Sequence, residues 1–379
     1  MEWLKKNNVG WVDLLRILAI FFVVWSHCCD QFIADFSNKS SFHWGVFMET
    51  VGRPCVVLLT MISGYLLLPF KKEYSLGEYY KKRIGRILVP LVFWSLVLPI
   101  AFFLYYSGPG ADSACPSLNP ASFDSGNLLF SFYRFFFNFG YETTALWYLY
   151  MLIGLYLALP IVNSWLKTAS KKDVQVVLWI WFATLFIPYI RVVATLVGIS
   201  GDPGFAQLWG ECSWNVFGPF HYLSGFMGYM LLAWYLKEYP LNWSWPKTLT
   251  IGALTYLAGY AVTSFGYIFV QSKFPGDYTY LEIPWTMCGI NVALQAFGVY
   301  IVVSKLKIKS SPRLARAASL MFGIYLCHFP FVHMAYDWFN IESWPYLVRC
   351  LAMALSAFAI SYVISLVLYL FKPTRNLVK

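Results

Sequence analysis

Four ionisable side chains recur on one face of the first apolar stretch of the chain. Arg16 and His27 are eleven residues apart, so at about 100° per residue they return to within roughly 20° of the same helical face, about 16 Å apart along the axis. Asp13 lies one turn before Arg16 and Asp30 one turn after His27, on that same face. An imidazole with an ordinary pKa of about 6.5 can remove a proton from a hydroxyl or act as a nucleophile, and a carboxylate such as Asp30 can orient the ring.

These polar residues stand in a stretch that is otherwise apolar, which makes their presence costly. An intramembrane charge costs at least about 2.5–3.5 kcal/mol, so a partner or an aqueous cavity is the default expectation. Taken singly, Arg16 could snorkel to one membrane edge and His27 could be an interfacial residue at the other. The same expectation of a partner or cavity applies to three further arginines in or near apolar stretches: Arg53, Arg191 and Arg349.

A second polar cluster lies near the end of the chain. His328 follows Tyr325 in an apolar stretch, and Pro330 frees a backbone carbonyl close to it. A functional and a structural role for His328 both remain open. His333 is five residues further on, about 140° round a helix from His328, and is expected to be an interfacial or structural residue.

A third cluster is basic. Arg83 and Arg86 share one helical face, next to Lys82. Guanidinium groups match phosphate oxygens, so this cluster could bind a polyanion. The alternative is that these charges only set the orientation of the chain in a membrane.

The elements that position these clusters follow from composition. Hydrophobic residues make up 59% of the 379-residue chain and charged residues 12%, about half the usual share of roughly 25% in soluble proteins. A membrane-spanning helix needs about 20 apolar residues, and continuous runs of this length exclude a membrane barrel. We therefore predict an all-α polytopic bundle with about ten transmembrane helices, near 11–29, 45–70, 84–106, 146–163, 174–197, 214–236, 248–270, 284–304, 314–336 and 345–371.

The distribution of Lys and Arg predicts the orientation of these helices. Alternate connections carry 21 of the 28 basic residues, and the others carry three. The positive-inside rule then places both termini in the cytoplasm. The net charge of +10 is explained by this bias, so nucleic acid is not an expected partner. No small-residue cleavage site follows the first span, so it is expected to be retained and not removed as a signal peptide.

One long connection, 107–145, is predicted on the outer side. It begins with Gly and Pro residues and ends in an aromatic stretch from Phe130 to Phe139. A loop of this length in a compact bundle is usually functional, so we expect a lid whose aromatic half lies at the membrane interface. The whole chain, 1–379, is otherwise expected to form one membrane-embedded domain.

Five motifs in order resemble the integral-membrane acyltransferase 3 family, over nearly the whole chain. They are Arg16 with His27 in the first span, Ser63-Gly64-Tyr65-Leu66-Leu67, Arg83 with Arg86, Leu146-Trp147-Tyr148, and Gly323-Ile324-Tyr325-Leu326 before His328. The chain is most similar to the branch that O-acetylates surface polysaccharides, such as the enterobacterial common antigen O-acetyltransferase. The resemblance implies a multi-pass enzyme of the inner (plasma) membrane, which transfers an acetyl group from cytoplasmic acetyl-CoA to a sugar hydroxyl outside.

The resemblance also implies roles for residues of this chain. His27 becomes the catalytic histidine, Arg16 its partner across the membrane, and Arg83 and Arg86 the contacts to CoA phosphates, with Lys82 beside them. Asp30 as the residue that orients His27 is our inference from spacing. One departure is Ala145, where many members carry a histidine, and His221 or Glu142 could replace it. We expect acceptor contacts from His328, Tyr325, Trp147 and Glu142. Trp147, Trp209 and Trp214 are candidates for stacking on a sugar ring, but anchoring at the membrane interface is the favoured role for these tryptophans.

Two other classes of function were considered. A glycolipid or polysaccharide-precursor transporter would use the same charges as a path, but its inverted repeats are not evident in the sequence. A scaffold protein would not need the polar face of the first span. The eight cysteines have no metal-binding spacing, so no metal is expected, and Cys115 and Cys212 could pair in an oxidising compartment. The acceptor glycan, the oligomeric state and a covalent acyl-histidine are left open by the sequence.

Overall fold

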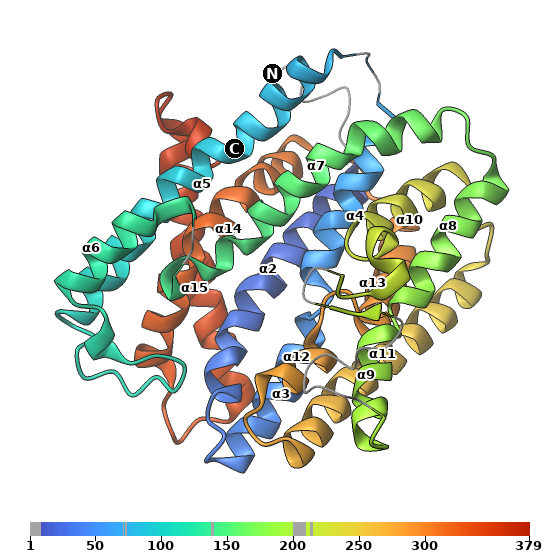
Figure 1. Ribbon diagram of the computed structural model, residues 1–379. Coiled ribbons are helices and arrows are strands. Elements are labelled where there is room, and N and C mark those ends of the chain that lie inside the picture. Colours follow the sequence, from blue (N-terminus) through green and yellow to red (C-terminus); the bar gives the residue numbers. More distant parts are fainter. Residues whose placement is uncertain (1–8, 71, 73, 138–139, 200–209, 213–214) are drawn as a thin grey trace. The chain divides into compact units, whose positions relative to one another are not determined.

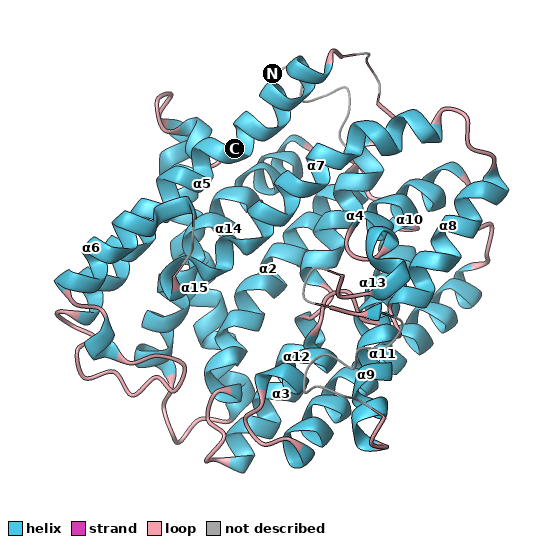
Figure 2. Ribbon diagram, in the orientation of Figure 1, coloured by secondary structure: helices cyan, strands magenta, loops and turns pink. Residues whose placement is uncertain are grey.

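The fold is all-α, as predicted. The structure is a computed structural model that describes residues 9–70, 72, 74–137, 140–199, 210–212 and 215–379. Helices form the regular elements throughout these ranges (Figures 1 and 2). The described residues contain no β-strand, and their isolated β-bridge joins Cys212 and Asn215.

The chain groups into two compact units, each built from separated segments of the sequence. Unit 1 comprises residues Met1–Gly52, Tyr74–Leu159 and Ile308–Lys379, and unit 2 comprises Arg53–Glu73 and Pro160–Lys307. The three predicted polar clusters all belong to unit 1.

Unit 1 is organised around its two most enclosed helices, α2 and α14. Helix α2 packs against α3, α14 and α15, and α14 packs against α15. In the most apolar 18-residue stretch of α14, 72% of the residues are buried, compared with 28% for the same length of α15. The polar groups of α14 therefore face protein. Gly323 permits the close approach of α14 to α15, because a Cβ atom there would lie 2.2 Å from Oγ of Ser365. The elements of unit 1 are α2 (Gly10–Ile33), α3 (Lys39–Gly52), α5 (Leu76–Tyr106), η1 (Pro120–Ser122), α6 (Ser125–Arg134), η2 (Phe135–Phe137), η3 (Tyr141–Leu146), most of α7 (Trp147–Leu166), α14 (Pro312–Phe339), α15 (Tyr346–Leu370) and η6 (Arg375–Leu377).

Unit 2 is a second helical bundle, in which α4 packs against α10 and α13, and α11 against α13. Gly64 of the predicted motif allows the contact between α4 and α10, because a Cβ atom there would lie 2.3 Å from the carbonyl oxygen of Met230. The elements of unit 2 are α4 (Cys55–Leu67), the end of α7, α8 (Lys171–Thr184), α9 (Ile187–Leu196), η5 (Gly218–Leu223), α10 (Met227–Glu238), α11 (Trp245–Lys273), α12 (Tyr278–Trp285) and α13 (Ile290–Ser304).

Nine of the ten predicted spans correspond to helical segments that are long and apolar enough to cross a membrane, within the described ranges. The remaining predicted span, 214–236, is not one long helix. Its described part consists of η5 and the 12-residue α10. Gly225, with φ of +85°, lies between the two. A residue at positive φ cannot continue a right-handed helix, and apolar content alone did not reveal this break.

The arginines expected to need partners have them. Nε of Arg53 donates to the carbonyl oxygen of Trp285 at 2.9 Å. Nε of Arg191 donates to Oε1 of Glu211, also at 2.9 Å. Arg349 donates to the carbonyl oxygen of Trp344 at 2.8 Å and to Oδ1 of Asn340 at 3.0 Å, and so ties the turn between α14 and α15. These contacts satisfy charges that lipid would exclude.

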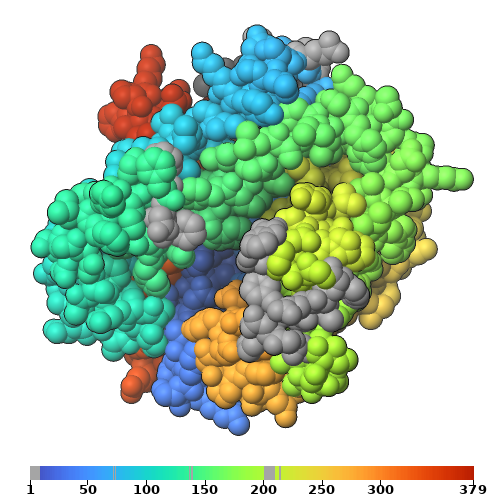
Figure 3. Space-filling view, in the orientation of Figure 1, coloured from blue at the N-terminus to red at the C-terminus, as the bar shows by residue number. Residues whose placement is uncertain are grey.

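The connection 107–145 is structured in its described part, and its α6 stretch lies at the surface (Figure 3). Helix α6 is amphipathic, and its apolar side chains Leu129, Phe130 and Tyr133 are exposed by 70%, 51% and 82%. Asp124 caps the helix by accepting a hydrogen bond from the amide of Asn127 at 2.8 Å. An exposed apolar face of this kind agrees with the predicted place at the membrane interface, which stays a prediction.

Candidate active site

The polar face of α2 has the local geometry that the spacing predicted. Nδ1 of His27 lies 3.0 Å from Oδ2 of Asp30, and Nη1 of Arg16 lies 3.8 Å from Oδ1 of Asp13. The side chain of His27 is 23% exposed and that of Asp13 only 7%. The face therefore carries an ion pair near one end and a histidine–carboxylate hydrogen bond near the other, and the His27–Asp30 pair remains partly exposed.

Arg16 shares an electrostatic partner with the basic cluster of α5. The hydroxyl of Tyr156 on α7 interacts electrostatically with Arg16, Arg83 and Arg86. The two predicted cationic clusters thus both act electrostatically on one tyrosine that the sequence did not single out. Lys82 has a different partner. Its Nζ donates to the hydroxyl of Tyr74 at 3.1 Å, and its side chain is exposed.

His328 is brought next to His27 by the packing of α14 on α2. The centroids of the two imidazole rings are 5.4 Å apart, with an angle of 32° between the ring planes. Nδ1 of His328 lies 2.6 Å from the carbonyl oxygen of Tyr325, and the ring is fully buried. Its Nε2 has no hydrogen-bond partner among the described residues.

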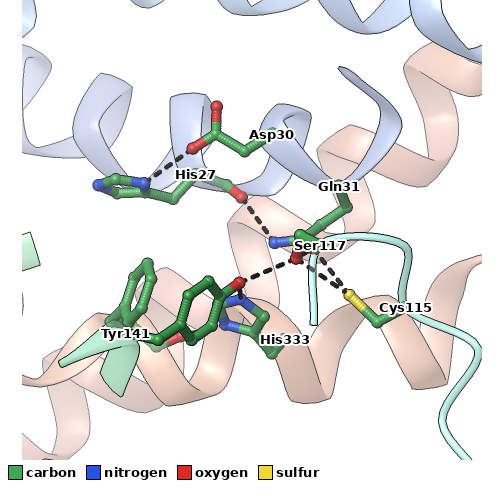
Figure 4. Close-up of polar contacts among 8 residues, drawn as sticks. His27, Asp30, Gln31, Cys115, Ser117, Tyr141 and His333 are labelled. Atoms are coloured by element: carbon green, nitrogen blue, oxygen red, sulfur yellow. Dashed lines mark hydrogen bonds and ion pairs between the residues drawn. The ribbon is translucent and has the colours of Figure 1, made fainter. Parts of the chain in front are cut away.

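A chain of hydrogen bonds connects the backbone of His27 with His333, through Gln31, Ser117 and Tyr141, which the sequence did not single out (Figure 4). The hydroxyl of Tyr141 lies 2.8 Å from Nε2 of His333 and 2.9 Å from Oγ of Ser117. Ser117 donates to Oε1 of Gln31, whose Nε2 donates to the carbonyl oxygen of His27 at 3.2 Å. His333 is therefore buried in protein beside the candidate site.

The only sequence signal for these residues was weak. Gln31 is an amide four residues after His27 in an apolar run, and so lies about one turn further along α2. Ser117 and Tyr141 lie in the long connection, where spacing says nothing about position. Their convergence on Gln31 is a tertiary contact.

Cys115 and Asp337 complete the attachment of the 107–145 connection. Sγ of Cys115 donates to Oε1 of Gln31 at 2.7 Å. Asp337 of α14 accepts from Ser113 at 2.6 Å and from Tyr105 at 3.0 Å. Burial raises the pKa of the Cys115 thiol to about 11. We call the contacts of Cys115 and Ser117 with Gln31 the outer clasp, because they hold the connection over the C-terminal end of α2, which is predicted to be the outer end.

The cysteines predicted as a possible pair are both free. Cys115 is buried in the outer clasp, and Cys212 is a partly exposed thiol in unit 2. The structure thus assigns Cys115 a hydrogen-bonding role in unit 1 in place of the disulfide considered from the sequence.

The remaining predicted acceptor residues have mainly structural contacts. The hydroxyl of Tyr325 donates to the carbonyl oxygen of Ala145, the position that lacks a histidine. Glu142 is buried and accepts from Ser131 of α6 at 3.4 Å, and no hydrogen bond joins it to His27 within the described chain. Trp147 stacks edge-on against Tyr148. His221 belongs to η5 of unit 2, and Trp209 and Trp214 lie outside the described residues.

The arrangement can perform proton and group transfer. The Asp30 carboxylate accepts from Nδ1 of His27, which leaves the lone pair of the neutral ring on Nε2. An imidazole held in this tautomer by a carboxylate is the general base or nucleophile of acyl-transfer chemistry. The arginines around Tyr156 supply positive charge that could hold phosphate groups.

Comparison with known proteins agrees with this chemistry. The model of a protein family described as an acyltransferase domain matches residues 9–368. No curated protein and no solved structure matches the chain.

Proposed function

Because this chain belongs to the acyltransferase domain family, we propose that it transfers an acetyl group from acyl-CoA in the cytoplasm to a hydroxyl group outside. The proposed acceptor is a surface glycan or glycolipid, as in the branch of the family that O-acetylates surface polysaccharides. The proposed location is the inner (plasma) membrane. The single observation that carries the proposal is the His27–Asp30 pair on the interior helix α2, with Nδ1 and Oδ2 3.0 Å apart.

His27 is the residue at which the acyl group and the acceptor meet. A sugar hydroxyl is a poor nucleophile at neutral pH, and removal of its proton by a positioned imidazole contributes typically about 10²–10⁴-fold to the rate. Asp30 fixes the ring tautomer and stabilises the imidazolium that forms. The contacts of His27 are compatible both with a base acting directly on the hydroxyl and with a transient acyl carrier.

The donor site lies on the side of α2 that carries Arg16. Three guanidinium groups, those of Arg16, Arg83 and Arg86, interact electrostatically with the Tyr156 hydroxyl. The phosphates of CoA are polyanionic, and Arg forms the strongest charge-assisted hydrogen bonds to them. Arg83 and Arg86 hold the phosphates in this proposal.

Arg16 acts further along the path from donor to acceptor. Eleven residues separate it from His27, which corresponds to about 16 Å along a helix, so the two side chains cannot act on the same atom. Arg16 instead stabilises the pantetheine carbonyls or the thioester oxygen as the acyl group passes along α2.

Donor consumption tests the reaction class. The purified protein in liposomes, supplied with acetyl-CoA, is expected to release CoA and to acetylate added glycan, whereas a transporter would leave acetyl-CoA intact. Mass spectrometry of surface glycans from cells with and without the gene identifies the acceptor. Acetyl-CoA that stays intact with every glycan acceptor while a glycolipid crosses the membrane would favour the transporter.

A further inference from the structure

Nε2 of His328, which lies next to His27, is a buried atom without a hydrogen-bond donor among the residues that the structure describes. Nδ1 of His328 lies 2.6 Å from the carbonyl oxygen of Tyr325. A carbonyl oxygen only accepts, so this contact assigns the ring hydrogen to Nδ1 and leaves Nε2 of the neutral imidazole as an acceptor. Nε2 is buried and has no hydrogen-bond partner in the described part of the chain. Buried acceptors without partners are rare in folded proteins, and each calls for an explanation.

The neighbouring ring is in the same tautomer. Nδ1 of His27 donates to Oδ2 of Asp30 at 3.0 Å, so its free lone pair is also on Nε2. The two ring centroids are 5.4 Å apart. In their neutral forms the two imidazoles therefore both present an Nε2 lone pair within one site, although a simple general-base mechanism needs only one.

Their surroundings suit the two rings to different steps. His27 has a carboxylate partner, which offsets the positive charge that the ring acquires when Nε2 bonds to a carbonyl carbon. It is also 23% exposed, so a thioester can approach it. His328 has a backbone carbonyl as its partner and is fully buried. Within the described ranges its Nε2 lacks a hydrogen-bond donor. The acceptor hydroxyl can supply that hydrogen, whereas the thioester carbonyl has none to donate.

One imidazole cannot complete both halves of a two-step transfer. Once Nε2 of His27 carries the acyl group, its lone pair is used, and Nδ1 is already protonated against Asp30. The attacking hydroxyl then needs another base. We propose that His27 carries the acyl group and that His328 is a second catalytic base, which takes the proton of the acceptor hydroxyl. This inference rests on the proposed function.

The steps balance as follows. The Nε2 lone pair of His27 attacks the thioester carbon, an N–C bond forms, the C–S bond breaks, and CoA leaves as a thiolate opposite an acyl-imidazolium paired with Asp30. The hydroxyl oxygen then attacks the acyl carbon, an O–C bond forms, and the N–C electron pair returns to Nε2 of His27. The hydroxyl proton moves to Nε2 of His328, from which water returns it to the CoA thiolate.

The covered position of His328 sets one requirement. Its ring lies against His27 and Phe329, with centroid distances of 5.4 Å and 6.3 Å. The acylated ring of His27 must therefore turn aside as the hydroxyl enters. Asp30 accepts the hydrogen bond from Nδ1 of the His27 ring, so the Asp30 side chain must follow the ring for that bond to be kept.

The test separates the two half-reactions. Purified protein in liposomes is pulsed with acetyl-CoA labelled in the acetyl group and then chased with a glycan acceptor that the wild-type protein acetylates. His328→Asn keeps an amide that can donate to the Tyr325 carbonyl but lacks the Nε2 base. It is expected to acquire label on His27, shown by peptide mass spectrometry, while transfer to the glycan falls by roughly 10²–10⁴-fold. His43→Gln on α3 is the matched control and should behave as wild type.

Other outcomes overturn the inference in distinguishable ways. Wild-type transfer by His328→Asn excludes the second base. Loss of both labelling and transfer in His328→Asn, with normal expression and an unchanged melting temperature, places His328 in the first step and also contradicts it. Added imidazole should restore transfer in His328→Ala, and a failure to do so counts against the base role. Failure of the proposed function itself would appear as no acetyl-CoA consumption by the wild-type protein.

Discussion

Nδ1 of His27 lies 3.0 Å from Oδ2 of Asp30, one turn later on the same helix. The pair is local, so α2 alone sets its geometry. Its consequence is not local, because the orientation of the His27 ring places it against His328 of α14, 5.4 Å away between centroids. The two helices together convert a pattern in one span into a site with two imidazoles.

Asp30→Asn tests whether the carboxylate fixes the working form of His27. The amide can present its NH₂ group to Nδ1, which favours the wrong tautomer and no longer stabilises the imidazolium. We expect a fall of about 10²-fold in the rate of acetyl transfer, with little change in the amount of folded protein. Steady-state rates at saturating donor measure this. Asp112→Asn, at an exposed position of the same outer side, is the control, and an equal fall in both variants would show that the effect is not specific.

Arg83→Gln and Arg86→Gln test the donor site. Both arginines interact with the region around Tyr156, and loss of one charged hydrogen bond to a phosphate costs about 1.5–3 kcal/mol. We expect KM for acetyl-CoA to rise by roughly 10–100-fold, with a smaller change in kcat. Initial rates over a range of acetyl-CoA concentrations give both constants. Arg375→Gln near the end of the chain should leave KM unchanged, and an unchanged KM in the Arg83 and Arg86 variants would remove the phosphate assignment.

The part of the site that lies within one helix could be predicted from the sequence. The i, i+3 spacing placed Asp13 with Arg16 and His27 with Asp30, and both pairs are present at 3.8 Å and 3.0 Å. The partners needed by the intramembrane arginines were also expected from the cost of burying a charge. These predictions succeeded because helical periodicity and desolvation act on neighbouring residues and need no knowledge of the packing.

Contacts between distant segments could not be predicted in this way. The proximity of His328 to His27 depends on how α14 packs against α2, and Tyr141 reaches His333 from a connection without periodicity. Helix geometry correctly separated His328 from His333 on their own helix but did not reveal that both rings contribute to one polar region. The predicted span 214–236 failed for a related reason, since the positive φ of Gly225 is a backbone property that hydropathy does not register.

Gln31→Leu tests the outer clasp. Oε1 of Gln31 accepts from Cys115 and Ser117. Removing it takes the acceptor from the buried Cys115 thiol, at about 1–3 kcal/mol for a buried group, and leaves the half-buried Ser117 hydroxyl with Tyr141. We expect faster hydrogen exchange of the amides in residues 113–118 and weaker acetyl transfer, because the connection no longer holds its place beside His27. Hydrogen exchange with mass spectrometry measures the first effect. Ser122→Ala, which removes a bond within the connection itself, should leave exchange at 113–118 unchanged. If the amides of Gln31→Leu remain as protected as in wild type, the clasp does not hold the connection.

Cys115 provides a pH-dependent readout of the same clasp. Burial raises its pKa to about 11, from about 8.5 in an unfolded chain, so the folded state retains the thiol proton longer than the unfolded state does. At neutral pH the thiol is protonated in both states and does not change the free energy of unfolding. That free energy falls as the pH rises from the unfolded pKa to the folded pKa.

Alkylation of Cys115 measures this shift. The thiolate is the reactive form, so at pH 8 we expect modification at roughly one hundredth of the rate of an exposed cysteine, still rising with pH beyond 10. In Gln31→Leu the rate at pH 8 should increase. A rate in the wild-type protein that levels off near pH 9 would contradict a buried, hydrogen-bonded thiol.

The central claim is that His27 performs acyl transfer, and the most direct measurement is the rate at which liposomes containing the purified protein move labelled acetyl from acetyl-CoA to glycan. The wild-type protein is expected to acetylate the glycan. His27→Ala, reconstituted to the same amount and with the same melting temperature, should be slower by about 10³-fold or more, since both the base and the acyl carrier are lost. Acetyl transfer by His27→Ala at the wild-type rate would contradict the account.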